Sequence, residues 1–354
     1  MIIYLTLPGD TLEKISSDLK IENPVYLREF HNTHCAKHER FYSDLKPGQS
    51  LLLPFGNEIK ELNKKIIENG DSLYYHPQQG KIPFQIPLLK GIYKINHQKF
   101  LDDELLTDYQ YQIELSYIKF EDHHHIFNIH MSDFKKEGQE SDTKISNLAK
   151  ACVEILYPLT LLLNEKRELK NISLTSPENS IKDQLEALKS YFTDQYSSSY
   201  INQMKWIVGE KKNLLENLKN TLPIHFLVGS FYRTTYGDWT DSQIYHDFLP
   251  WITNASPIRF QLHNKITPNE DNNSLKITQS GHSSDNRNLD QLYSKSFVYD
   301  DNTLSTNKTV NCTHFAEYIF NRKELSVQKI EGVFNLYIDD VIEKEVFSME
   351  KQQN

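Results

Sequence analysis

The sequence has few cysteines and no excess of basic residues, and each shortage excludes a class of protein. The three cysteines, Cys35, Cys152 and Cys312, are too few and too scattered for a disulfide framework, so a reducing interior is expected. The 48 acidic residues outnumber the 39 basic ones and give a formal net charge of −9, which argues against a nucleic-acid partner held by phosphate attraction. With 20 Tyr and 18 Phe, the chain is expected to be globular.

Long hydrophobic runs are also missing. The most apolar run, residues 155–163, is nine residues long and contains Pro158, so no transmembrane segment is expected. The first residues, Met-Ile-Ile-Tyr-Leu, lack the basic region and cleavage site of a signal peptide, which predicts a cytoplasmic protein or one exported by a dedicated secretion apparatus. We find no nucleotide-binding loop, zinc-protease motif or serine nucleophile elbow, and expect no cofactor.

The most informative stretch covers residues 3–54, where turn, capping and periodicity signals predict the order strand, helix, helix, strand. The expected elements are a strand over residues 2–7, a helix capped by Asp10 or Thr11, a second helix beginning at Pro24, and a strand over residues 51–53.

Two separate motifs stand out in this stretch. The first is Gly9-Asp10-Thr11-Leu12, with Ile15 three residues further on. The second is Leu-Lys-Pro-Gly-Gln-Ser-Leu-Leu-Leu-Pro, from Leu45 to Pro54. Together with Leu27 and Asn32, the two motifs resemble a LysM domain, whose second helix carries a Leu and an Asn at the matching positions. The segment from 33 to 44 departs from the family, because it is longer than the usual short link and rich in charge and His.

The resemblance implies binding rather than catalysis. LysM domains hold glycans that contain N-acetylglucosamine, such as peptidoglycan or chitin, in a groove between the loop after the first strand and the loop before the second. The corresponding glycan-binding residues here are Gly9, Asp10, Thr11, Leu12, Leu45, Lys46, Pro47, Gly48 and Gln49. The alternative is that these residues only build turns and cap a helix.

A second partner class comes from the placement of the module. LysM-like modules at the N-terminus of proteins without a signal peptide also resemble those of contractile injection machines, such as type VI secretion systems and phage tails. The expected partner is therefore either an N-acetylglucosamine-containing glycan or a protein of a secretion apparatus.

The predicted fold class is α+β. A small βααβ module at residues 1–55 is followed by a linker with a short helix at 56–90. A larger body at 91–354 contains antiparallel strands and about three helices, and it matches no family that we recognise. We expect this body to bind a partner protein.

Within the body, alternation and periodicity predict the individual elements. They are strands over 109–117 and 127–131 joined by a turn at His123–His125, a helix over 144–163 capped by Ser141 or Asp142 and kinked at Pro158, a strand over 169–174, helices from Ser176 and over 201–218, and strand residues from Phe226 and Val228 onward.

Three residue clusters invite a chemical interpretation. His31, His34, Cys35 and His38 have the i, i+3, i+4, i+7 spacing of one helical face and the ligand types of a zinc site, although a polar loop explains them equally. A polar and aromatic cluster around Gly237 suits either partner contacts or a packed loop: Arg233, Tyr236, Asp238, Trp239, Asp241 and Tyr245.

The third cluster, Asn311-Cys312-Thr313-His314-Phe315, resembles the motif of the lecithin:retinol acyltransferase-like thiol fold. It supports an alternative function, a cell-wall- or lipid-acting enzyme or toxin with Cys312 as nucleophile. No general-base His precedes it in a matching context, and alternation at Ala316, Tyr318 and Phe320 predicts a strand rather than a helix. We therefore assign no catalytic or metal-binding residue and expect a non-enzymatic protein.

Overall fold

The computed structural model describes residues 1–77, 80–140, 143–236, 241–268, 273–295 and 309–352. Its contacts divide into two compact units. Unit 1 contains Met1–His76 together with Asn273 and Arg322–Glu324, and unit 2 contains the remaining described residues. Each unit has its own core. Among the described residues, no helix is long and apolar enough to cross a membrane.

Unit 1 contains the predicted β-α-α-β order. Its elements are β1 (Ile2–Leu5), α1 (Leu12–Asp18), α2 (Pro24–His34), η1 (Lys37–Glu39), β2 (Ser50–Leu53) and α3 (Asn57–Glu68). The side chain of Thr11 caps α1 by accepting from the Lys14 amide, and Asn23 caps α2 ahead of Pro24 at the first helical turn. β1 and β2 pair in antiparallel register.

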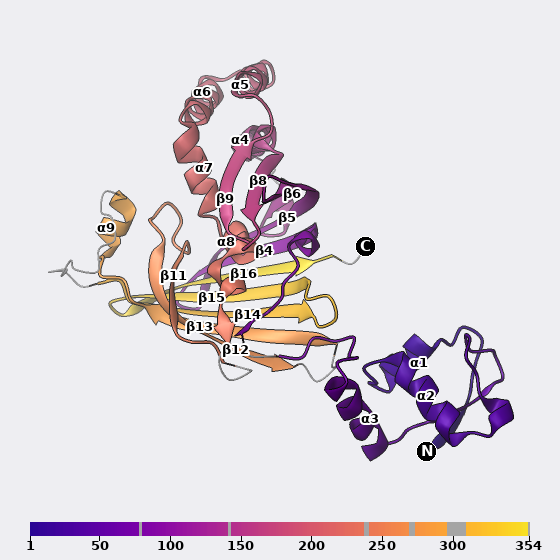
Figure 1. The fold of residues 1–354 in the computed structure, drawn as a ribbon. Coiled ribbons are helices and arrows are strands. Elements are labelled where there is room, and N and C mark those ends of the chain that lie inside the picture. The colour runs from indigo at the N-terminus through magenta and orange to yellow at the C-terminus, as the bar shows by residue number, and fades with distance from the viewer. Residues whose placement is uncertain (78–79, 141–142, 237–240, 269–272, 296–308, 353–354) are drawn as a thin grey trace. The chain divides into compact units, whose positions relative to one another are not determined.

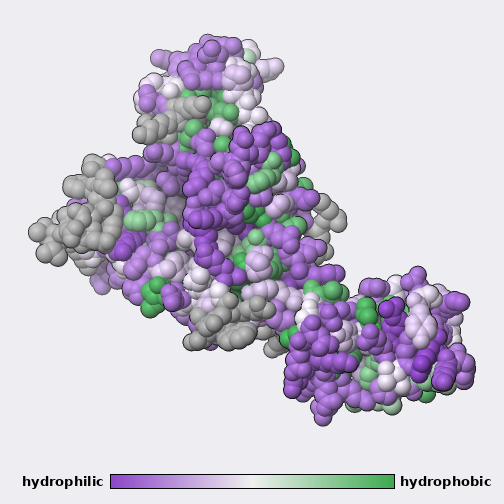
Figure 2. All heavy atoms as spheres, in the orientation of Figure 1, coloured by the Kyte–Doolittle hydropathy of each residue, from purple (hydrophilic) through white to green (hydrophobic). Residues whose placement is uncertain are grey.

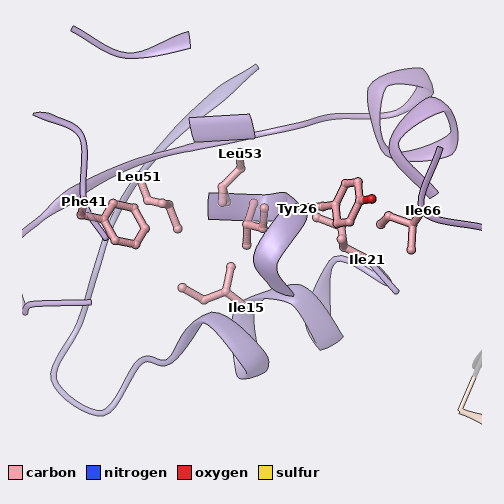
Figure 3. Packing of buried hydrophobic residues seen from close by; sticks show 8 residues of the cluster. Ile15, Ile21, Tyr26, Phe41, Leu51, Leu53 and Ile66 are labelled. Atoms are coloured by element: carbon pink, nitrogen blue, oxygen red, sulfur yellow. The ribbon is translucent and has the colours of Figure 1, made fainter. Parts of the chain in front are cut away.

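The core of unit 1 is small and includes α3. Figure 3 shows side chains of α1, α2 and β2 meeting in one cluster, with Ile66 of α3 beside Tyr26. Ile66 is fully buried, so α3 packs onto the same core as the two earlier helices. A unit of this size has little apolar burial to spare, which gives the added helix a clear physical role.

Unit 2 is built on a twelve-stranded antiparallel sheet with the order β11-β12-β13-β14-β15-β16-β4-β5-β6-β8-β9, in which β7 adds to β6 (Figure 1). The strands are β4 (Gly91–Leu101), β5 (Glu104–Glu121), β6 (His124–Lys136), β7 (Gln139–Glu140), β8 (Leu159–Asn164), β9 (Leu169–Leu174), β11 (Tyr245–Leu249), β12 (Ile258–Pro268), β13 (Ser274–Ser283), β14 (Cys312–Asn321), β15 (Val327–Ile338) and β16 (Val341–Lys351). A separate two-stranded pair joins β3 (Gly80–Lys81) to β10 (Thr235–Tyr236).

Helices complete unit 2. They are η2 (Ile86–Leu89), α4 (Lys144–Leu156), α5 (Glu178–Ala187), η3 (Leu188–Ser190), α6 (Gln195–Gly209), α7 (Lys211–Lys219), α8 (Leu222–Val228), η4 (Ser230–Arg233) and α9 (Leu289–Ser294). Helices α4, α5 and α6 share a hydrophobic cluster of their own, which includes Cys152, Ile181 and Ile201.

Helix α8 lies against one face of the sheet (Figure 1). The ring of Phe226 stacks on Phe347 of β16 with 5.0 Å between centroids, and Trp251 stacks on Phe334 of β15 at 5.5 Å. Gly332 of β15 leaves room for these rings, since a Cβ there would lie 2.8 Å from Phe226 Cζ. The core of unit 2 is therefore an aromatic layer between α8 and the sheet.

Two predicted elements of the body are wrong. The helix expected over 144–163 ends at Leu156, and residues from Leu159 onward form strand β8. Pro158 has no N–H to continue the helix, and the following leucines alternate between buried and half-buried as a strand requires. Phe226 and Val228 were expected in a strand but lie in α8, where six of the seven residues are buried.

Other expectations hold with smaller changes. Thr143 caps α4 with its side chain, while Ser141 and Asp142, the predicted caps, lie outside the described residues. The β5–β6 turn is formed by Asp122 and His123, which both have positive φ, whereas His124 already belongs to β6. The strand over 169–174 is confirmed as β9.

Candidate functional site

The two loops predicted to bind glycan meet at Thr6. This residue is 2% exposed and follows β1 directly, just before the first loop. Its hydroxyl donates to the carbonyl of Lys46 over 2.6 Å and accepts from the Gln49 amide over 3.0 Å. Its carbonyl accepts from the Gly48 amide over 2.8 Å. One buried threonine therefore fixes the 45–49 loop beside the start of the 7–12 loop.

Asp10 holds the first loop in shape. Its carboxylate accepts from the Leu7 amide over 2.8 Å and from the Tyr4 hydroxyl over 2.7 Å. The Leu7 amide, followed by the Tyr4 hydroxyl, lowers the pKa of Asp10 below its usual value. The same hydrogen bond raises the pKa of Tyr4. Asp10 is therefore committed to the turn.

The remaining predicted residues divide into turn builders and exposed groups. Gly9 and Gly48 have φ of +90° and +79°, so both occupy left-handed turn positions that favour glycine. The side chain of Gln49 accepts from the Lys46 amide within its own loop. Exposed residues of the two loops include Thr11, Lys46 and Pro47, while Leu12, Leu45 and Gln49 are half-buried.

Apolar side chains lie beside these loops. Ile3, Leu5 and Leu7 alternate along β1 and its extension and are 72%, 59% and 59% exposed. The opposite face of the strand carries the half-buried Tyr4 and the buried Thr6. Although the visible surface of unit 1 is largely hydrophilic (Figure 2), one face of its short sheet therefore offers an apolar row.

The His31 cluster is not arranged as a metal site. Helix α2 ends at His34, and His38 lies in η1, so the four residues do not share one continuous helix. Both ring nitrogens of His31 have protein partners, the Leu52 amide at 3.0 Å and the Glu39 carbonyl at 3.2 Å. Within the described part of the chain, no group of three or more metal-ligating side chains is found.

Cys312 does not have the environment of a nucleophile. It is the first residue of strand β14 and is fully buried. Burial, followed by the charge of Asp285, raises the pKa of its thiol well above the ordinary value. A reactive cysteine needs the opposite, an accessible thiol with a lowered pKa. The predicted strand at 316–320 is confirmed as part of β14.

The nearby His314 is also part of the core. Its Nδ1 accepts from Trp251 Nε1 over 3.1 Å, and its Nε2 lies 2.8 Å from Gln279 Oε1. Burial lowers its pKa to about 3, so it stays neutral at ordinary pH. The sequence placed Cys312 and His314 together, but the structure uses both for packing and hydrogen bonding.

The predicted polar and aromatic cluster is only partly described, because residues 237–240, including Asp238 and Trp239, lie outside the described ranges. Tyr236 is buried, and the Tyr245 hydroxyl contacts Asn264 Oδ1 at 3.1 Å and Gln279 Nε2 at 2.6 Å. Those two residues therefore have packing roles in unit 2.

Sequence reasoning missed a charged cluster on the inner face of the sheet. Glu345 of β16, 9% exposed, lies 2.7 Å from His97 Nε2 and 2.8 Å from Lys99 Nζ. Lys99 is directly opposite Glu345 in the β16–β4 register. β4 and β16 lie at opposite ends of the body in sequence, so no local sequence pattern predicts the contact.

No family model matches the chain, and no curated protein matches its sequence. Two solved structures share distant likeness. Lipovitellin, from a structure on its lipid–protein interactions, aligns at 11% identity with a TM-score of 0.37 over 75% of this chain and 25% of that chain. A protein of unknown function of the DUF3598 family from Nostoc punctiforme aligns at 9% identity with a TM-score of 0.13 over 77% of this chain and all of that chain. This chain thus spans about a quarter of the lipovitellin chain.

Proposed function

We propose that this is a non-enzymatic binding protein whose unit 1 holds a glycan containing N-acetylglucosamine, such as peptidoglycan. The observation that carries the proposal is the set of hydrogen bonds from Thr6 to Lys46, Gly48 and Gln49. They bring the two LysM-like loops to the same end of the β1–β2 sheet, where a ligand can touch both.

The surface chemistry of the loops suits a neutral sugar. Their carboxylate, Asp10, already has protein partners at both oxygens, because Oδ2 accepts from the Leu7 amide and the Tyr4 hydroxyl and Oδ1 lies 3.8 Å from Lys14 Nζ. The exposed Thr11, Pro47 and Leu7 offer a hydroxyl and apolar surface, the combination that sugar rings with polar edges and apolar faces require.

A second candidate function is docking of unit 1 inside a contractile injection apparatus, with the body bound to a partner protein. The observation that favours it is the exposed apolar row of Ile3, Leu5 and Leu7. Exposed apolar residues that follow one face of a short sheet are typical of protein contacts.

The enzyme alternative has less support. A thiol nucleophile must reach its substrate, and Cys312 is fully buried with a raised pKa. Cys312→Ala is therefore expected to leave glycan binding unchanged, and it would abolish toxicity only if the thiol acted as a nucleophile.

Titration calorimetry of the full chain with chitooligosaccharides tests the glycan proposal. A variant with Lys46→Ala and Pro47→Ala removes exposed side chains of the second loop without touching the Thr6 hydrogen bonds, which use backbone atoms of that loop. We expect binding in the micromolar to millimolar range that this variant weakens about tenfold.

The matched control is Tyr42→Ser, which removes a 76% exposed side chain from the 33–44 insertion of the same unit. Asp10 and Gly48 are poor probes, because Asp10 holds the turn and Gly48 has φ of +79°. Absence of binding at millimolar sugar would reject the glycan proposal. In that case, docking would be supported if the wild type captures a protein of the injection apparatus and an Ile3→Ser and Leu5→Ser variant does not.

A further inference from the structure

Unit 2 contains a cavity of about 590 Å³ at one end of the aromatic layer. Its floor includes His97 of β4 and Tyr111 of β5. One wall runs from Glu216 of α7 to Pro223 of α8, and the other is the loop from Pro250 to Pro257 between β11 and β12. A volume of this order lies within the range of small-molecule sites in proteins.

The two walls combine apolar residues with six neutral polar ones. The neutral polar lining residues are Asn217, Asn220, Thr221, Thr253, Asn254 and Ser256. Three of them have protein partners: Asn217 accepts from Lys295, Thr253 accepts from Lys99, and Thr221 donates to the Leu218 carbonyl. Within the described residues, the side chains of Asn220, Asn254 and Ser256 form no hydrogen bond. Their donors and acceptors are therefore available to a ligand.

His97 adds a hydrogen-bonding group with a defined role. Glu345 is held by Lys99 Nζ at 2.8 Å, and its second oxygen lies 2.7 Å from His97 Nε2. A carboxylate in this position accepts from Nε2–H, so Nδ1 is the ring nitrogen left for a ligand. Among the described residues, Nδ1 has no partner.

Charge around the cavity is balanced, which selects against an ionic ligand. Lys99 lies opposite Glu345, and the lining residues Glu216 and Lys295 carry one charge of each sign. The half-buried Tyr111 supplies aromatic surface, whereas Trp251, only 1% exposed, borders the cavity with its ring packed on Phe334 in the core. Burial raises the pKa of Tyr111, so its hydroxyl remains a donor. Amides, hydroxyls and aromatic rings without net charge match the polar edges and apolar faces of a sugar.

We propose that this cavity binds a neutral saccharide of one or two rings, with Asn220, Asn254, Ser256 and His97 as its hydrogen-bonding partners and Tyr111 at its apolar side. The inference does not rest on the proposed function, because every lining residue belongs to unit 2 whereas the proposed glycan loops belong to unit 1. The two proposals can fail separately.

The test follows 5-fluorotryptophan signals of the full chain during titration with maltose, cellobiose and N,N′-diacetylchitobiose. Trp251 lines the cavity, and Trp206 of α6, 65% exposed and outside the cavity lining, serves as the internal reference. We expect a saturable shift of the Trp251 signal with at least one sugar and none of Trp206. No saturable shift of Trp251 with any of the three sugars, up to their solubility, would overturn the proposal.

Two variants make the test specific. Asn220→Ala combined with Asn254→Gly removes two lining amides, and glycine is chosen at 254 because Asn254 has φ of +65°. We expect affinity about tenfold weaker at an unchanged melting temperature. The Lys46→Ala and Pro47→Ala variant of unit 1 should leave the Trp251 titration unaltered. If the Trp251 titration gives the same sugar affinity in the Asn220→Ala and Asn254→Gly variant as in the wild type, the proposed saccharide site is also rejected.

Discussion

Trp251 and His314 are joined by a hydrogen bond in the core of unit 2, in which the indole Nε1–H donates to His314 Nδ1 over 3.1 Å. The other ring nitrogen faces Gln279 Oε1 at 2.8 Å, an acceptor that also receives the Tyr318 hydroxyl. His314 must therefore be neutral, with its proton on Nε2. A second proton on Nδ1 would point at the Trp251 Nε1–H and remove the acceptor of this hydrogen bond.

This geometry predicts a loss of stability in mild acid. The pKa of His314 is lowered to about 3 by burial, against an ordinary value of about 6.5. Above about pH 6.5, His314 is neutral in both the folded and the unfolded protein, and its full contribution to stability is present. Below that pH only the unfolded protein binds the proton, so stability is lost as the pH falls. Each further pH unit then lowers the free energy of unfolding by about 1.4 kcal/mol. The melting temperature should fall between pH 7 and pH 5.

The control for this prediction is His314→Gln, which keeps a polar side chain but removes the titrating group. Burial also lowers the pKa of His225, so part of the pH dependence should remain in the variant. Equal slopes of melting temperature against pH in the two proteins would contradict the assignment to His314.

Gly332→Ala should destabilise unit 2. The new methyl group would lie 2.8 Å from Phe226 Cζ and 3.0 Å from Trp251 Cη2, inside the aromatic layer. Overpacking of this kind costs about 1–3 kcal/mol. Chemical denaturation followed by near-UV circular dichroism measures the effect, and Gly332→Ala should cost less in a Phe226→Leu background, where the nearest ring is absent. A stability equal to that of the wild type would mean that α8 shifts freely on the sheet.

Thr6→Val should loosen the 45–49 loop. The substitution removes the hydroxyl that donates to Lys46 and accepts from Gln49, at a cost of about 1–3 kcal/mol. Hydrogen exchange of the Gly48 and Gln49 amides should accelerate roughly 5- to 150-fold, and chitooligosaccharide binding should weaken with it. Thr6→Ser keeps the hydroxyl and is expected to behave like the wild type. Unchanged exchange in Thr6→Val would show that backbone pairing alone holds the loop.

The cysteines should differ sharply in reactivity. Cys35 is half-buried, whereas Cys152 and Cys312 are buried and have pKa values raised by burial, that of Cys152 to about 11. A thiol reagent should modify Cys35 alone in the folded protein and all three residues after denaturation. Cys35→Ser should abolish the native reaction. Rapid native labelling of Cys312 would instead revive the nucleophile hypothesis.

Local signals predicted unit 1 well because they act over a few residues. Thr11 and Asn23 cap their helices through side-chain hydrogen bonds, and Pro24 begins α2 as expected. The contact that unites the two loops was not predictable in this way. Thr6 and Lys46 are 40 positions apart, and their hydrogen bond depends on the β1–β2 register.

In the body, hydrophobic periodicity predicted two elements incorrectly. Helix α8 is buried on nearly all sides, so it has no polar face to reveal a helical period, and the alternation of Phe226 and Val228 suggested a strand. In residues 159–163, leucine occupies four of five positions, so the pattern fits both the 3.6-residue repeat of a helix and the two-residue repeat of a strand. The cavity walls and the Glu345 cluster come from segments distant in sequence, so composition alone gave no sign of them.

The pairing of β16 with β4 has a consequence for synthesis on the ribosome. His97 and Glu345 are 248 positions apart, so at 5–20 residues per second roughly 10–50 s separate their translation. During that interval the edge of β4 that pairs with β16 has no partner strand, because β16 is the last strand of the sheet to be made. Unpaired edges of this kind invite association with other chains. Nascent chains of this protein are therefore expected to depend on chaperones until β16 has emerged.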